Sequence, residues 1–207
     1  MGNIVTAKVT IRGTRPLFWH WFGPDAIPLE KEERTGVAGN DPEEWRSTCL
    51  VTKDGQMYLD GAYAFSTIRW GGVRIKNGRA SIMNDIAATL QIQESVILVD
   101  RWFPGFPNGQ AFDVKAVPEP PRDPMEPLYL DVRGVVNPST KGRNVRYRIA
   151  ANPGWSCSFV MEWDKTVVNR EQMKAALLDA GKLVGIGNAR KIGMGRFEVL
   201  QFDVEEV

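Results

Sequence analysis

Apolar and polar residues alternate over residues 3–12. The apolar positions are Val5, Ala7, Val9 and Ile11. Because successive side chains of a strand point to opposite faces, this alternation predicts a half-buried β-strand. Similar short runs predict further strands at 48–53, 95–100, 128–136, 144–150, 156–163 and 196–204. The run at 95–100 is continuously apolar, which is typical of a strand covered on both faces. In the last strand, Phe197, Val199 and Gln201 are expected to share one face.

Two segments have the periodicity of helices. Asn169 and Gln172 have the spacing of a capping box, and this predicts a helix that begins there and stops at Gly181. Its apolar face would contain Met173, Leu177 and Ala180. Ser81 is expected to cap a second helix, with Ile82, Ile86 and Leu90 on one face. Residues 61–70 fit either a helix or a strand.

Two long segments lack any period. Residues 13–46 are rich in Gly, Pro and acids, and residues 102–127 contain seven prolines, which preclude a central strand or helix. We interpret both as irregular insertions in a single domain spanning 1–207. The order of the remaining elements predicts an α+β fold of the ferredoxin-like or RRM-like type. In it an antiparallel sheet has helices on one face and a long N-terminal insertion.

Composition excludes several classes of function. The 207 residues contain no apolar run of about 18, so no membrane-spanning helix is expected. No secretory signal is recognisable at the N-terminus, which favours the cytoplasm of a prokaryotic cell or of a phage-infected host. Two cysteines and one histidine, His20, are too few for a disulfide framework or a His-rich metal site. The sequence therefore predicts neither a metal nor another cofactor.

The charges balance in total but are separated along the chain. There are 26 Lys and Arg against 25 Asp and Glu, and residues 25–60 contain nine acids and four bases. Three stretches contain bases and no acid. Their bases are Arg69, Arg74, Lys76 and Arg79; Lys141, Arg143, Arg146 and Arg148; and Lys182, Arg190, Lys191 and Arg196. If these stretches converge, they form a site for polyanions, and otherwise they are ordinary solvated loops.

Five glycines lie between the last helix and the last strand, interleaved with bases. They are Gly181, Gly185, Gly187, Gly193 and Gly195. The spacing and the following strand fit neither a dinucleotide fingerprint nor a Walker loop. Free backbone N–H groups in such a loop would suit a phosphate backbone lying across it. The alternative is a tight connection in which glycine is required by geometry alone.

This segment resembles the C-terminal glycine-rich loop of the RAMP superfamily, the RRM-like RNA-binding proteins of CRISPR systems. The matching residues are Leu177, Leu178, Ala180, Gly181, Gly185-Ile-Gly187, Arg190 and Gly193-Met-Gly195-Arg196-Phe197-Glu-Val199. The likeness is greatest to the backbone subunits that polymerise along guide RNA. Phage-encoded relatives share an early strand ending like Val9-Thr-Ile-Arg-Gly-Thr-Arg-Pro-Leu17. The resemblance implies a homo-oligomer or a subunit of a ribonucleoprotein.

The leading hypothesis is a non-catalytic protein that binds single-stranded RNA or DNA, with RNA favoured, with tolerance of sequence and with assembly along the strand. Its predicted contacts are the twelve bases of the acid-free stretches together with Gly185, Gly187, Gly193 and Gly195. Arg146 and Arg148 would share one strand face, and Trp70, which lies among bases, would stack a nucleobase.

Two alternatives stay open. One is a RAMP-type endoribonuclease using His20, although a histidine among aromatics is more typical of a core. The other is a structural, self-assembling protein without nucleic acid.

Overall fold

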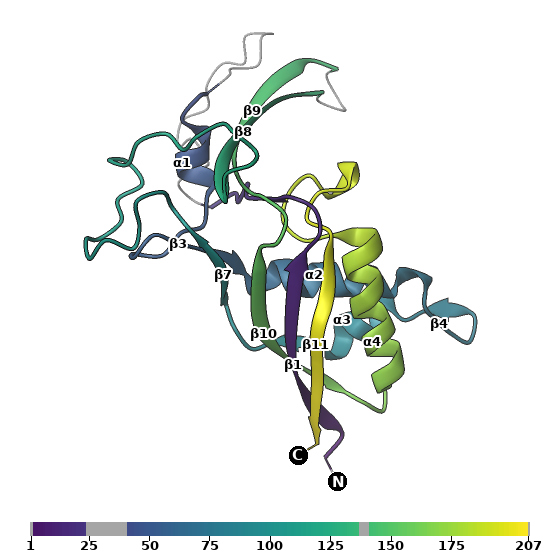
Figure 1. Ribbon diagram of the computed structural model, residues 1–207. Coiled ribbons are helices and arrows are strands. Elements are labelled where there is room, and N and C mark those ends of the chain that lie inside the picture. The colour runs from purple at the N-terminus through teal and green to yellow at the C-terminus, as the bar shows by residue number, and fades with distance from the viewer. Residues whose placement is uncertain (1, 24–40, 137–140, 207) are drawn as a thin grey trace.

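A computed structural model describes residues 2–23, 41–136 and 141–206 (Figure 1). Its main sheet is antiparallel, and its strand order is β11-β1-β10-β7-β3. The strands are β1 (Ile4–Gly13), β3 (Gln56–Asp60), β7 (Val96–Trp102), β10 (Ser156–Asp164) and β11 (Phe197–Glu206). The short strand β6 (Gln91–Ile92) pairs with β10 beside β7.

Three helices cover one face of this sheet (Figure 1). They are α2 (Gly61–Gly71), α3 (Met83–Thr89) and α4 (Arg170–Asp179). Along the chain, β1, α2, β7, β10, α4 and β11 form a βαββαβ unit, and β3 adds a strand at one edge. This unit consists of two βαβ halves whose strands share one antiparallel sheet, which is the ferredoxin-like arrangement. The predicted fold class, with helices on one face, is confirmed.

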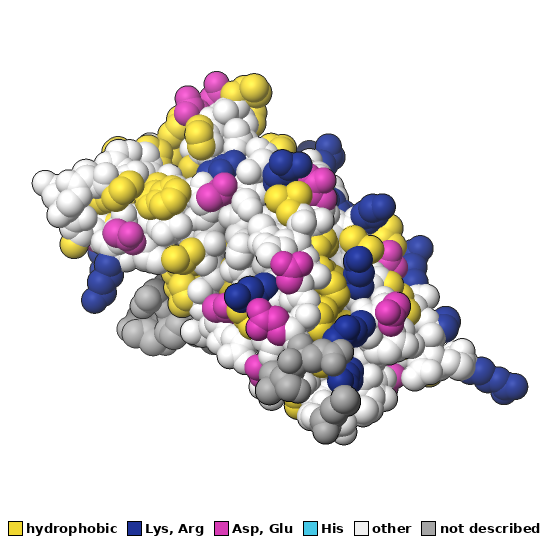
Figure 2. Space-filling view, turned by 60° about the horizontal axis from the view of Figure 1, so that its bottom comes forward, with side chains coloured by type: hydrophobic (Ala, Val, Ile, Leu, Met, Phe, Trp, Pro, Cys, Tyr) yellow, Lys and Arg dark blue, Asp and Glu magenta, His cyan; other side chains and the backbone are white. Residues whose placement is uncertain are grey.

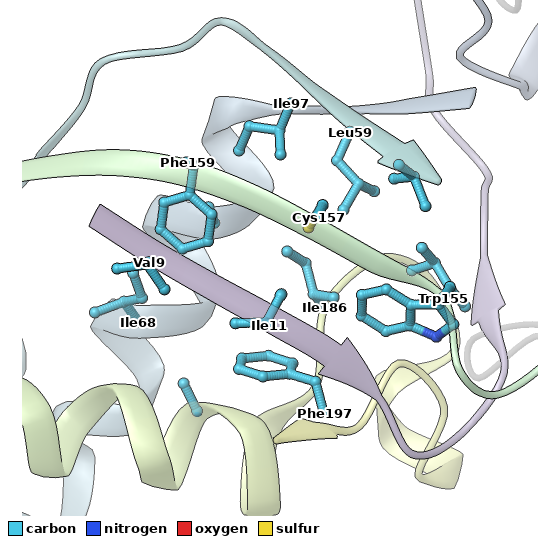
Figure 3. Close-up of a cluster of buried hydrophobic side chains, with 14 of the residues drawn as sticks. Val9, Ile11, Leu59, Ile68, Ile97, Trp155, Cys157, Phe159, Ile186 and Phe197 are labelled. Atoms are coloured by element: carbon cyan, nitrogen blue, oxygen red, sulfur yellow. The ribbon is translucent and has the colours of Figure 1, made fainter. Parts of the chain in front are cut away.

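The core lies between the sheet and the helices. Alternate residues of β1, among them Val9 and Ile11, point inward against Ile68 of α2 and Phe159 of β10 (Figure 3). Ile186, from the loop after α4, is also buried in this cluster. The main core therefore extends beneath the glycine-rich segment and fixes its position.

A second, smaller sheet stands at one end of the main sheet (Figure 1). It has the order β2-β9-β8, formed by β2 (Leu17–Phe18), β8 (Leu128–Val136) and β9 (Arg143–Ala151). The short helix α1 (Glu44–Thr48) packs against β9. A small hairpin of β4 (Lys76–Asn77) and β5 (Ala80–Ser81) follows α2 through the 3-10 turn η2 (Gly72–Arg74).

Several predicted strands and the capping box are confirmed. Strand β1 and strands β8 to β10 lie where the alternation placed them, within one residue or two at each end. In α4, the Asn169 side chain accepts from Gln172 N–H, and the Gln172 side chain accepts from Asn169 N–H. Met173, Leu177 and Ala180 are buried as expected. The ambiguous segment 61–70 is helical because Asp60 caps it by accepting from Ala62 N–H.

Three expected details of the elements are wrong: the end of one helix, the cap of another and the buried face of the last strand. Helix α4 does not stop at Gly181 but continues through a π turn, η3 (Ala180–Val184), and ends at Gly185 with φ of 81°. Ser81 belongs to β5, and Ile82 precedes α3 without a side-chain cap. A register shift between β1 and β11 at Thr10/Ile11 reverses the inward face, so Gln201 is exposed. Phe202 and Val204 pack against the core instead.

Two expected strands also differ. Residues 48–53 hold only an isolated bridge from Val51 to Met57, and the strand itself is β3. The segment 95–100 is covered on one face only, because Val96 and Leu98 are exposed on the other.

Of the expected insertions, 102–127 begins with Trp102, the last residue of β7, and its other residues, all of which the structure describes, contain no helix or strand. The other, 13–46, includes β2 and the start of α1, and its residues 24–40 lie outside the described ranges. The single-domain assignment stays a prediction.

Candidate nucleic-acid interface

The glycine-rich loop, residues 181–196, is shaped by close packing against the N-terminal segment. A Cβ on Gly187 would lie 2.8 Å from the Phe18 carbonyl oxygen, and one on Gly185 would lie 2.5 Å from the Met194 carbonyl oxygen. Gly195, with φ of 67°, faces the Ile186 carbonyl oxygen at a distance that leaves no room for a Cβ. Positive φ and close backbone approach both require glycine at these positions.

The backbone of this loop is already hydrogen-bonded at several glycines. Gly185 N–H donates to Ala180 O (2.8 Å), Gly195 N–H donates to Pro16 O (2.7 Å), and Gly193 N–H donates to Arg190 O (2.9 Å). Amides that are satisfied in this way are not free for phosphate. The expectation of free N–H groups at these three glycines is therefore wrong, and the loop presents side chains instead.

Two of the three acid-free stretches meet in one groove of about 420 Å³, which we name the Trp70 groove. It is lined by Trp70, Gly71, Val73, Arg74, Asp179, Leu183, Val184, Arg190 and Lys191. These residues come from α2, η2, the end of α4, η3 and the 3-10 turn η4 (Arg190–Ile192).

Close contact between α2 and α4 brings the two sides of the Trp70 groove together. Gly71 lies against the Ala176 carbonyl oxygen, where any Cβ would clash. Thr67, one turn earlier on α2, donates to the Gly185 carbonyl oxygen (3.1 Å) and fixes the start of the loop. The α2 surface that bears Trp70 therefore faces the loop that bears Arg190.

The cations of the Trp70 groove are available to a ligand. Arg74, Arg190 and Lys191 form no ion pair with any residue that the structure describes. The floor is apolar, since Val73 and Leu183 are both exposed there beside the Trp70 ring. An exposed ring with unpaired cations around it suits a nucleobase and its phosphates.

A second groove, of about 680 Å³, lies on the other side of the glycine-rich loop. It is lined by Thr14, Arg15, Leu178, Gly181, Lys182, Gly193, Arg196, Phe197, Glu198 and Val199, and we name it the Arg196 groove. One terminal nitrogen of Arg196 is buried without a hydrogen-bond partner in the described structure, and desolvation lowers the pKa of this guanidinium. A partly desolvated cation of this kind favours an anion.

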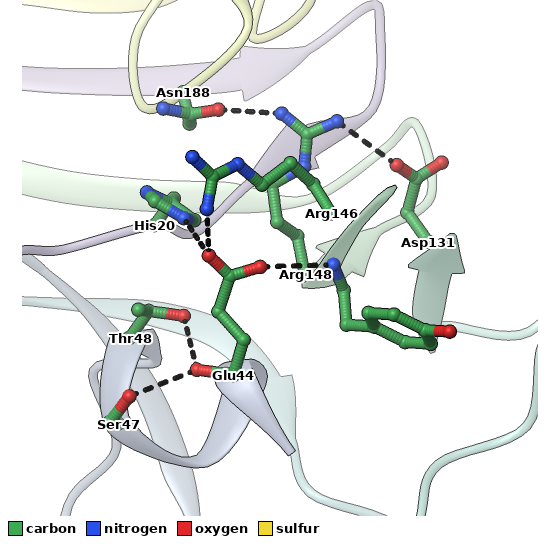
Figure 4. A network of polar contacts seen from close by, with 9 residues as sticks. His20, Glu44, Ser47, Thr48, Asp131, Arg146, Arg148 and Asn188 are labelled. Atoms are coloured by element: carbon green, nitrogen blue, oxygen red, sulfur yellow. Dashed lines mark hydrogen bonds and ion pairs between the residues drawn. The ribbon is translucent and has the colours of Figure 1, made fainter. Parts of the chain in front are cut away.

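The acid-free stretch 141–148 does not join these grooves, and tertiary partners neutralise its arginines Arg146 and Arg148 (Figure 4). Arg146 pairs with Glu44 of α1. Arg148 is only 5% exposed and donates to Asp131 (3.3 Å) and to Asn188 Oδ1 (2.7 Å). The expectation that Arg146 and Arg148 form part of a basic track is wrong. Here they join β9 to α1 and to the glycine-rich loop.

The remaining predicted bases occupy separate places. Lys76 and Arg79 are exposed on the β4–β5 hairpin, which projects from the body near α3 (Figure 1). Lys141 and Arg143 are exposed at the start of β9. Arg69 lies on α2 with its Nε buried and without a hydrogen-bond partner in the described structure. Figure 2 shows one face on which basic side chains gather along one side, with acidic side chains between them.

His20 is buried in a polar and aromatic setting. Its side chain is 6% exposed, its Nε2 lies 3.0 Å from Glu44 Oε1, and its ring packs edge-on against Phe22. No local pattern around His20 indicates this carboxylate partner, which is 24 residues away. The arrangement is that of a satisfied core histidine.

Of the tryptophans, Trp70 is the most accessible at 48% exposure. Trp102 is 37% exposed and lies on β7, whereas Phe103 and Trp155 are buried. Trp70 is therefore in the best position to stack a base.

Sequence reasoning missed Asp179, Arg15 and Leu183 as lining residues, since nothing in their local pattern distinguishes them from a helix surface or a loop.

No group of three or more His, Cys, Asp or Glu side chains within the described ranges is arranged to hold a metal ion. In the same part of the chain, no helix has the length and apolar character needed to span a membrane.

Comparisons with known proteins give a likeness in structure only. No protein-family model and no curated protein matches the sequence. A chain of a type III-B Cmr-beta complex bound to cognate target RNA is 11% identical, with a TM-score of 0.49, over 98% of this chain. The present chain spans 61% of the length of that protein. A chain of a type IV-B CRISPR complex is 14% identical, with a TM-score of 0.42, over 98% of this chain and 91% of the other.

Both solved structures are of CRISPR complexes.

Proposed function

We propose that this protein binds single-stranded nucleic acid in the Trp70 groove, with RNA preferred over DNA and with little dependence on sequence along most of the strand. The observation that supports this most strongly is the convergence of Trp70, Arg74, Arg190 and Lys191 from distant parts of the chain. The preference for RNA rests on the resemblance of the glycine-rich segment to RAMP proteins.

An unpaired base suits this groove better than a duplex. Stacking on a side chain requires a base face that is free of its neighbours, which a single strand offers. The Arg196 groove, across the same loop, provides Arg15, Lys182 and Arg196 for further phosphates of the strand. Contacts to phosphate are independent of sequence.

The first experiment measures the affinity of a labelled 15-nucleotide polyuridine for the protein and for the triple variant Arg74→Ala, Arg190→Ala, Lys191→Ala. The triple variant should bind at least about 10-fold more weakly at low salt. Its slope of log affinity against log salt should shrink by about 0.7 for each phosphate that the variant no longer neutralises. The same oligonucleotide as DNA tests the preference for RNA.

A matched control removes three exposed bases from another region. Lys53, Lys115 and Arg122 are exposed near and within the irregular segment 103–127, on the opposite side of Figure 1 from α4. Changing these three residues to Ala should leave the affinity within about twofold, because the total charge changes equally and all three residues, of which Arg122 is paired with Glu119, lie outside both grooves. Equal losses of affinity in the two triple variants would contradict the proposal.

The stacking contact is tested separately. Trp70→Ala should weaken binding by about 1–3 kcal/mol, the usual contribution of one base stacked on an aromatic side chain. Trp102→Ala is the control, because Trp102 is also exposed and lies outside both grooves.

The endoribonuclease alternative is less well supported. An imidazole that is 6% exposed and paired with Glu44 cannot approach a scissile phosphate without rearrangement. Incubation of RNA with the protein and with His20→Ala tests it: cleavage that depends on His20 would favour the enzyme over a binding protein.

Assembly along the strand, as the resemblance implies, stays a prediction. Sedimentation with 15-nucleotide and 60-nucleotide polyuridine should give about one copy on the short strand and several on the long one. Self-association without any nucleic-acid binding would instead favour the structural alternative.

A further inference from the structure

Asp179 is the one acidic residue in the lining of the Trp70 groove, whose other charged residues are all basic. It is the last residue of α4, and the π turn η3 continues the helix beyond it to Val184. Arg74, Arg190 and Lys191 line the same groove, yet Asp179 forms no ion pair with the described residues. An unpaired carboxylate in a groove that otherwise attracts anions points to a role toward the ligand.

The four nucleobases differ in the hydrogen-bond donors that they present to a carboxylate. Guanine presents two adjacent donors, N1–H and the N2 amino group, which match the two oxygens of a carboxylate. Cytosine and adenine each present one amino group beside an acceptor nitrogen. Uracil has acceptor oxygens on both sides of N3–H, and these repel a carboxylate.

We propose that Asp179 makes the Trp70 groove selective for guanine at one base position. In this arrangement the guanine ring stacks on Trp70, its N1–H and N2 amino group donate to the Asp179 carboxylate, and Arg74, Arg190 and Lys191 bind the flanking phosphates. The inference rests on the proposed function. It adds one specific position to a strand that is otherwise bound without regard to sequence.

The test compares two labelled 12-nucleotide RNAs, polyuridine and the same strand with one central guanine. A bidentate base contact contributes about 1–3 kcal/mol of discrimination, so the guanine strand should bind roughly 10-fold more tightly. Asp179→Ala should remove this difference, and its affinity for polyuridine should rise, because a negative charge leaves the groove.

Asp179→Asn provides a second variant of nearly the same shape. An amide can accept from uracil N3–H and donate to uracil O4, so this variant should shift the preference from guanine toward uracil. A residue that acts only through the fold would change both affinities equally. Thermal unfolding of each variant confirms that the fold is kept.

The outcomes separate the two proposals. If polyuridine binds through the groove cations but guanine gives no advantage, or if the advantage persists in Asp179→Ala, the role of Asp179 is wrong and the proposed function stands. If neither strand binds the original protein, both proposals are wrong.

Discussion

At the scale of single residues, the glycine-rich loop shows why one motif supports two interpretations. The sequence predicted both a surface for phosphate and a tight connection. The structure places Gly185, Gly187 and Gly195 in close backbone contacts, so they are required by geometry. The bases between them, Arg190 and Lys191, line the groove. The motif therefore builds the loop, and its basic side chains are the groups available to a ligand.

The first prediction concerns the difference between Gly195 and Gly193. Both have positive φ, 67° and 82°, but only Gly195 faces a carbonyl oxygen that a Cβ would strike. Gly193→Ala should lower the free energy of unfolding by about 1–2 kcal/mol from backbone strain alone. Gly195→Ala adds a steric clash and should lower it by about 3 kcal/mol or more. Urea unfolding measures both, and equal effects would contradict the packing role of Gly195.

The second prediction concerns Glu44. Burial alone would raise the pKa of Glu44, but the hydrogen bonds from His20 and from Tyr147 N–H, with the charge of Arg146, outweigh it and hold the pKa below 4.5. A carboxyl with a depressed pKa in the folded state stabilises the protein above its unfolded pKa. This stabilisation is lost as the pH falls through the folded value.

The measurement is the difference in unfolding free energy between the original protein and Glu44→Gln. It should be constant near neutral pH and should shrink progressively below about pH 4.5. Glu126→Gln, at an exposed position, is the control and should show little difference throughout. A Glu44 difference that does not depend on pH would show that the network does not favour the charged carboxylate.

At the scale of elements, local patterns were sufficient where neighbours in sequence decide the structure. The capping box of α4 and the alternation in β8 to β10 are examples. The sequence was insufficient where distant partners decide. Nothing near Arg146 indicates Glu44, which is 102 residues away. Asp131 could have been found from the hairpin register, since it lies opposite Arg148 across the β8–β9 pair.

The third prediction concerns the buried pair of Arg148 and Asp131, which ties the second sheet to the glycine-rich loop through Asn188. Asp131→Ala leaves a buried guanidinium without its carboxylate and should cost about 3–5 kcal/mol in unfolding free energy. Adding Arg148→Met removes the unpaired charge and should recover part of this stability. The exposed pair of Arg12 and Glu198 is the control, and Glu198→Ala should have little effect.

At the scale of the whole molecule, ion pairing distinguishes the open face of the main sheet from the two grooves beside the glycine-rich loop. The open face of the main sheet pairs its charges internally, with Arg12 beside Glu198 and Lys8 beside Glu205. The grooves on either side of the glycine-rich loop keep their cations unpaired within the described residues. Two of the three acid-free stretches contribute residues to the lining of the Trp70 groove. The stretch 141–148 does not, and folding brings acids to its Arg146 and Arg148.

The most direct test is to map where the strand lies. Photo-crosslinking of a 4-thiouridine RNA, followed by mass spectrometry, should label peptides containing Trp70 and Arg190–Lys191. Competition with unlabelled polyuridine should abolish these products. Crosslinks confined to the open sheet face, to Trp102 or to residues 141–143, with none in the Trp70 groove, would contradict the proposed binding site.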